Sequence, residues 1–148
     1  MSSIFAIFLA GVAGAAMALQ GTFNTAAGKV IGYAENTLLV HGVGFVVIAI
    51  LLFLLGAGRG DWGKIGEIPW YGYLGGVLSA VIIFTVIYSM SKLGVGNATA
   101  IIVLVQLGTA LLIDSFGLFG AEKIDFAWIR FLGMGLLVVG AKLVFFRV

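Results

Sequence analysis

Five long apolar runs, each close to 20 residues, constrain this chain more than any other feature. They cover about residues 4–28, 36–55, 70–92, 97–116 and 126–146. The hydrocarbon core of a bilayer is about 30 Å thick, and roughly 20 apolar residues cross it as a helix. Transmembrane strands would alternate apolar and polar residues with a period of two, whereas residues 45–55 do not alternate. The pattern therefore predicts an all-α integral membrane protein with five transmembrane helices.

Composition agrees with this class and excludes several others. Of the 148 residues, 62% are hydrophobic and 9% are charged, against about 45–50% and about 25% in soluble domains. The net charge of +2 comes from scattered residues, without the basic stripe that nucleic-acid binding requires. The chain has no cysteine, which excludes disulfides, thiol catalysis and Cys-ligated zinc. No His, Asp or Glu cluster has metal-ligand spacing, so we expect neither an enzyme nor a bound metal or cofactor.

The loops between the runs are short, and the longest covers about residues 56–68. We therefore expect residues 1–148 to form a single transmembrane domain. Five spans place the N-terminus and the second and fourth loops on one side of the membrane. That side carries Arg59, Lys64, Lys123 and Arg130, and the other side carries Lys29, Lys92, Lys142 and Arg147.

An excess of Lys and Arg in the cytoplasmic loops normally fixes orientation, and this chain has no excess on either side. Either other features set the orientation weakly, or the chain inserts both ways and pairs as an antiparallel homodimer. The odd number of helices suits the second interpretation. Many transporters consist of two inverted halves, and two oppositely inserted five-helix copies would form a ten-helix bundle with an inverted repeat.

Polar side chains at membrane depth mark the candidate site, because placing them in lipid is costly. Gln20 and Asn24 are four residues apart and share a helix face, while Gln106 lies near the middle of the fourth run. The three amides either line a solute pathway or tie helices together by hydrogen bonds, and the sequence fits both interpretations. Phe23 and Tyr88 are expected to provide apolar walls for such a pathway.

Two ionisable side chains are candidates for proton coupling. Imidazole changes charge between about pH 5 and 8, which suits His41, although it lies about 7 Å from the centre of its run at 1.5 Å per residue. A lone histidine near a helix end more often bonds a backbone carbonyl or faces the interface. Asp114 lies near the end of the fourth run, where pairing with Lys123, Arg130 or a tyrosine is the alternative to coupling.

Two motifs resemble signatures of a known family. The sequence QGTFN at residues 20–24 resembles its Q-G-x-x-N signature. The segment 106–120, which begins with Gln106 and contains Asp114 followed by FGLFG, resembles its second signature. The family is the YdcZ-like branch of the drug/metabolite transporter (DMT) superfamily, and the similarity covers essentially the whole chain.

The resemblance implies a five-helix half of a ten-helix inverted-repeat (DMT-like) fold in the bacterial inner membrane, occurring as dual-topology homodimers, paired genes or fusions. It also implies that Gln20, Asn24, Gln106 and Asp114 matter most. The chain departs from the family at His41, where the family usually has a small or apolar residue. It also has Ser115 where the family often has histidine. A role for His41 would therefore be particular to this protein or its close relatives.

We expect a small-solute transporter that works by alternating access between two inverted copies. Its partners would be a second copy of the chain, the lipid bilayer and the solute. The first run has no carboxylate in the membrane, unlike the small multidrug resistance exporters, so neutral, zwitterionic or weakly anionic solutes fit better than organic cations. A passive dual-topology channel and a structural or accessory membrane subunit are the alternatives.

Overall fold

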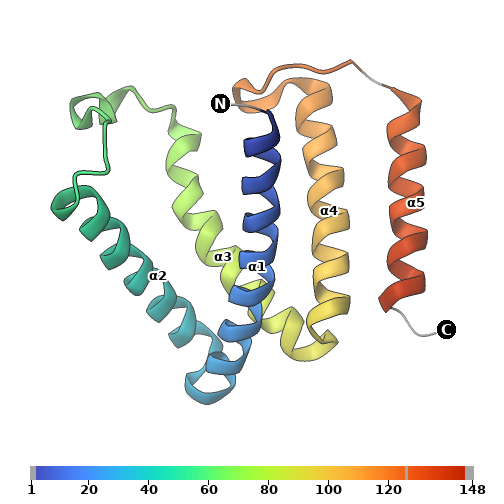
Figure 1. The fold of residues 1–148 in the computed structure, drawn as a ribbon, viewed down its shortest axis with the longest axis horizontal. Helices are drawn as coiled ribbons and strands as arrows, with labels where there is room; N and C mark the ends of the chain where they lie inside the picture. The colour runs from blue at the N-terminus through green and yellow to red at the C-terminus, as the bar shows by residue number, and fades with distance from the viewer. Residues whose placement is uncertain (1–2, 126, 146–148) are drawn as a thin grey trace. The chain divides into compact units, whose positions relative to one another are not determined.

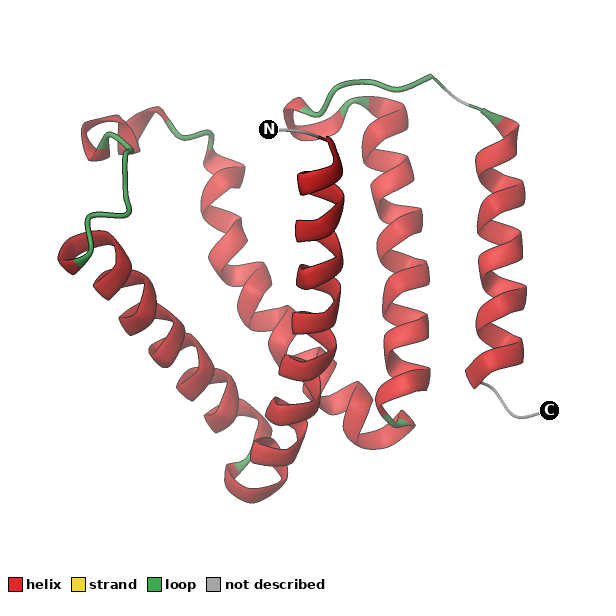
Figure 2. Ribbon diagram, viewed as in Figure 1, coloured by secondary structure: helices red, strands yellow, loops and turns green. Residues whose placement is uncertain are grey.

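The computed structural model describes residues 3–125 and 127–145, and over these residues the regular structure is helical, without a strand (Figure 2). Five long helices follow one another along the chain (Figure 1): α1 (Ser3–Ile31), α2 (Tyr33–Ala49), α3 (Leu74–Leu93), α4 (Val95–Phe116) and α5 (Trp128–Phe145). A π-helical turn, Ile50–Leu54, extends α2, and a 3₁₀ turn, Trp70–Tyr73, precedes α3. With these extensions the described residues include five helices long and apolar enough to cross a membrane, which confirms the predicted class and number of spans.

Two connections are shorter than the sequence predicts. Gly32 alone separates α1 from α2 and has a φ of 101°, and Gly94 alone separates α3 from α4 and has a φ of 82°. Glycine adopts such positive φ angles without steric cost, so a single residue ends one helix and the next begins at once. The predicted limits of the fifth helix, Phe126 and Phe146, lie outside the described residues.

The chain divides into two units, Met1–Ser91 and Lys92–Val148. Unit 1 contains α1, α2 and α3 as far as Ser91, and unit 2 contains α4 and α5. In unit 1, α1 and α2 meet at the Gly32 turn and separate with distance from it (Figure 1).

The core of unit 1 lies where the C-terminal half of α1 meets the first turns of α2 and the last turns of α3. Its buried residues are small on α1 and larger on α3: Gly21, Thr25 and Gly28 on the former, Ile87 and Met90 on the latter. The Tyr33 ring at the start of α2 packs edge-on against Tyr88 of α3, with ring centroids 6.1 Å apart. Small residues on α1 thus allow the close helix approach that packing in lipid requires.

A methyl group at Gly28 is expected to disrupt this core. A Cβ there would lie 2.8 Å from Cδ1 of Tyr33 and 3.0 Å from Cγ2 of Ile87, and neither a ring nor a β-branched side chain moves away easily. We expect Gly28→Ala to destabilise the protein by about 1–3 kcal/mol, measured as a lower midpoint of thermal unfolding in detergent. Gly14→Ala, where no heavy atom lies within 4 Å of the added Cβ, is the matched control. Equal midpoints for the two variants would contradict the packing.

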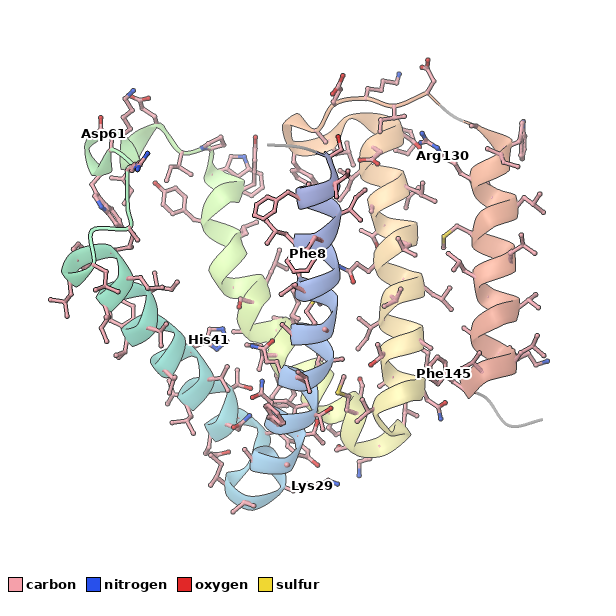
Figure 3. All side chains as sticks on the ribbon, in the orientation of Figure 1. Phe8, Lys29, His41, Asp61, Arg130 and Phe145 are labelled. Carbon is pink, nitrogen blue, oxygen red and sulfur yellow. The ribbon has the colours of Figure 1, made fainter. Side chains whose placement is uncertain are left out.

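In unit 2, α4 and α5 run side by side (Figure 1). The Phe145 ring of α5 covers Gly96 of α4 so closely that a Cβ at Gly96 would lie 2.7 Å from ring atom Cδ1. Figure 3 shows Phe145 beside the first turns of α4. At its other end α4 stops at Gly117, whose left-handed backbone (φ 63°, ψ 38°) ends the helix.

Most of the helix surface remains uncovered. In each of the five spans, between 0% and 11% of the most apolar 18-residue window is buried. Apolar side chains are as well accommodated by lipid tails as by other side chains, so this exposure suits a bilayer. The single chain therefore leaves most of its helix surface to lipid or to another polypeptide.

Candidate functional site

The two amides of α1 lie on the flank of its buried stripe. Gln20 is exposed and Asn24 is half-buried, next to the buried Gly21 and Thr25 respectively. Neither side-chain amide forms a hydrogen bond with any described residue. Thr25, by contrast, satisfies its hydroxyl within the helix by donating to the Gly21 carbonyl oxygen at 2.7 Å. The helix therefore supplies no partner for Gln20 or Asn24.

Asn36 ties α1 to α2 in a way that sequence reasoning missed. Its side chain is 1% exposed, and its Nδ2 donates to the backbone carbonyl oxygen of Asn24 at 3.2 Å. Asn36 lies three residues after the start of α2 at Tyr33, whereas the sequence predicted it at the helix boundary. Polarity was the only sequence signal, and an asparagine at a helix start is usually a cap. The bond between α1 and α2 thus uses the backbone of Asn24 and leaves its side-chain amide unpaired.

Gln106 is the candidate amide of unit 2. It lies at the centre of α4 (Val95–Phe116), its side chain is exposed, and its amide forms no hydrogen bond within the described part of the chain. Nearby Thr109 donates its hydroxyl to the Val105 carbonyl oxygen at 2.9 Å.

Of the two expected apolar walls, Phe23 projects from α1 with its side chain exposed. Tyr88 is also exposed, and its ring meets Tyr33. Tyr88 thus contributes to the contact between α2 and α3, and its role as a wall of a solute pathway stays a prediction.

His41 is the one histidine of the chain, and both of its ring nitrogens have partners. Its Nδ1 lies 2.8 Å from the backbone carbonyl oxygen of Thr37, and its Nε2 lies 3.1 Å from Oγ of Ser79 on α3. Figure 3 shows the imidazole on the side of α2 that faces α3. The bond to a backbone carbonyl is the arrangement that the sequence offered as the alternative to coupling, while the bond to Ser79 was not foreseen.

His41 also lies deeper than the sequence predicts. Because the span runs from Tyr33 to Leu54, the residue is about 4 Å from its midpoint at 1.5 Å per residue, in place of the predicted 7 Å or so. Ser79 lies about 4 Å from the midpoint of its own span, Trp70–Leu93, by the same measure. Both partners of the bond are therefore near the middle of their spans.

Asp114 is half-buried near the end of α4. Its backbone carbonyl oxygen accepts a hydrogen bond from the Ile124 amide at 2.9 Å, which folds the following loop back onto the helix end. Among the described residues its carboxylate forms neither the expected ion pair with Lys123 or Arg130 nor a bond to a tyrosine. A role in coupling stays a prediction.

A groove of about 520 Å³ lies between α4 and α5. Its walls are apolar, with Val103 and Leu107 on one side and Gly133 and Gly140 on the other. The Thr99 hydroxyl also lines it and is buried without a hydrogen-bond partner in the described part of the chain. Gly133 and Gly140 line the groove, and no heavy atom lies within 4 Å of a Cβ added at either.

Unit 1 carries two amide side chains and one imidazole, and unit 2 carries a third amide. Amide groups can both donate and accept hydrogen bonds. Within the described ranges no group of three or more His, Asp or Glu side chains could hold a metal ion.

Comparison with known families gives a match over nearly the whole chain. The family model DMT_YdcZ, described as "Putative inner membrane exporter, YdcZ", matches residues 5–143. This range includes both sequence motifs and every candidate residue discussed above. No curated protein and no solved structure matches the chain.

Proposed function

The chain belongs to the DMT_YdcZ family of inner membrane transporters, and from this membership we propose that it exports a small neutral, zwitterionic or weakly anionic solute by alternating access. It is a multi-pass protein of the inner membrane. The working unit is an antiparallel pair of copies, inserted in opposite orientations and forming a ten-helix bundle with an inverted repeat. The solute passes between the two copies.

The observation that carries this proposal is the pair of unpaired glutamines at mid-span. Gln20 and Gln106 are exposed and form no hydrogen bond with any described residue, although each lies near the middle of a long apolar helix. An amide without a partner in hydrocarbon costs several kcal/mol. Water, a solute, the other unit of the chain or a second copy must therefore satisfy both side chains. A solute pathway between two copies would provide water, the solute and the second copy.

Two further features support the antiparallel pair. The basic residues are divided four and four between the two sides, so no excess directs one orientation. The five spans each leave at least 89% of their most apolar window unburied, which leaves surface for a second copy. An odd number of spans also suits an inverted half, because a fused second copy would emerge inverted without an additional linker helix.

The solute class follows from the charges near mid-span. The membrane part of α1 contains no acidic residue, and α3 contains none between Leu74 and Leu93. An organic cation stripped of water would find no counter-charge there, and an unpaired charge at membrane depth is costly. Amide groups can donate and accept hydrogen bonds, so they suit neutral, zwitterionic and weakly anionic groups.

Reconstitution of the purified protein into vesicles tests the proposal. Four radiolabelled probes represent the solute classes: mannitol, alanine, lactate and choline. We expect saturable uptake and counter-exchange of at least one of the first three, and no choline uptake above protein-free vesicles. Uptake that rises linearly with concentration would indicate the channel alternative. Absence of uptake for all four by a stable purified dimer would favour the accessory subunit.

A further inference from the structure

We infer that His41 and Ser79 form a proton-binding site near the middle of the membrane, and that protonation of this site is coupled to export. The proton-binding site is formed by residues of one chain alone, whereas its coupling to export rests on the proposed function.

The geometry at His41 determines which ring nitrogen is free to accept a proton. A carbonyl oxygen can only accept, so the 2.8 Å contact with the Thr37 carbonyl requires a hydrogen on Nδ1. In the neutral ring Nε2 then carries the lone pair, and the Ser79 hydroxyl, 3.1 Å away, donates to it. The basic nitrogen therefore faces a group that can act as donor or acceptor.

Protonation needs only a rotation of the Ser79 hydroxyl. When Nε2 takes up a proton and an N–H bond forms there, the serine O–H turns away and its oxygen accepts the new hydrogen bond. The Nδ1–H bond to Thr37 stays in place. Each N–H of the imidazolium then has an acceptor, which offsets part of the cost of a charge at membrane depth.

Among the described residues of unit 1, no charged side chain forms a hydrogen bond or an ion pair with His41. Between Tyr73 and Tyr88, α3 has no titratable residue, and the membrane part of α1 has none before Lys29. On α2 the nearest is Glu35, six residues before His41 and about 9 Å away along the axis. The loop after α2 carries Arg59, Asp61, Lys64 and Glu67, all at least 18 positions along the chain from His41. A proton on Nε2 thus adds a charge that has no ion-pair partner among these residues.

The position of the bond explains how the proton affects the helices. Side chains join α2 to α3 at the Tyr33–Tyr88 ring contact near the Gly32 turn and at the His41–Ser79 bond nearer mid-span. Protonation reverses the direction of the second bond and places a positive charge between the two helices. A state in which α2 and α3 separate there, and admit water or an anionic solute group, is favoured by the charged form.

The site can be observed without any transport. The chain has one histidine, so protein labelled with ¹⁵N-histidine gives the two ring-nitrogen resonances of His41 alone in an NMR spectrum. The protein is purified on a tag without histidine. At high pH we expect a protonated Nδ1 and an unprotonated Nε2, and at low pH we expect both nitrogens to be protonated. An Nε2–H tautomer at high pH, or an unprotonated Nε2 at every pH at which the protein stays folded, would overturn the site.

Two serine variants test the partner. Ser79→Ala removes the donor and should shift the Nε2 resonance at high pH, while Ser79→Thr keeps a hydroxyl and should restore it. Ser89→Ala, ten residues along α3, is the matched control and should leave the resonance unchanged. If Ser79→Ala also leaves it unchanged, Ser79 is not the partner of Nε2.

Coupling is tested in vesicles with alanine as the probe, and with lactate in parallel. We expect the apparent affinity to change by about 5–150-fold across the pH range of the imidazole titration, the usual size of coupling between two sites. His41→Gln should remove this pH dependence and retain the wild-type unfolding midpoint.

Transport with the same pH dependence in His41→Gln would overturn coupling but leave the proposed function intact. An imidazole that titrates in a protein that transports no probe would overturn the proposed function and leave the site.

Discussion

Vesicles that contain Gln20→Ala protein are expected to take up the best transported probe with an apparent affinity about thirtyfold weaker than wild type. In an antiparallel homodimer each solute pathway contains two copies of Gln20, so the substitution removes two hydrogen bonds. At about 1 kcal/mol each, the loss is about 2 kcal/mol, and each 1.4 kcal/mol is about tenfold in affinity. Initial uptake rates over a range of probe concentrations measure the effect.

Thr22→Ala is the matched control for Gln20→Ala. Thr22 is also polar and exposed on α1, but its hydroxyl donates to the Ala18 carbonyl oxygen at 2.8 Å and needs no partner outside the helix. We therefore expect near wild-type affinity for Thr22→Ala. Undiminished uptake by Gln20→Ala would remove Gln20 from the pathway and leave the glutamine as a link between helices.

The number and class of the spans could be predicted because they depend on local composition. A run of about 20 apolar residues has one stable arrangement in a bilayer, a helix that crosses it. The helix limits were less accurate at Gly32 and Gly94. There a single residue with positive φ replaces a loop, and the sequence shows a glycine without showing its backbone angle.

The candidate site was also predictable in part, because the local sequence determines how deep a residue lies along its helix. Depth along a helix follows from residue counting, which placed Gln106 near the middle of its span. Contacts between helices depend on their rotation and crossing, which counting does not supply. The His41–Ser79 bond and the burial of Asn36 therefore emerged only from the structure.

The proposed insertion in both orientations predicts a second large effect, which variants with a charge bias test. Lys29→Gln with Lys142→Gln leaves two basic residues on one side and four on the other, and Arg59→Gln with Lys64→Gln reverses this ratio. All four side chains are exposed. Each double variant should insert mainly one way, because the side richer in Lys and Arg stays in the cytoplasm.

Each double variant expressed alone is then expected to lose most of its transport, and expression of the two together to restore it. If about nine chains in ten insert one way under the charge rule, only about a fifth of the chains can find an oppositely inserted partner. Together, the two variants supply both orientations again.

Because the chain has no cysteine, Gly60→Cys in the exposed loop after α2 provides a single thiol to report orientation. In the wild-type background this thiol should be labelled from both faces of the membrane, and in each double variant mainly from one. Labelling of the wild-type background from one face only, or full transport by either double variant alone, would contradict the antiparallel pair.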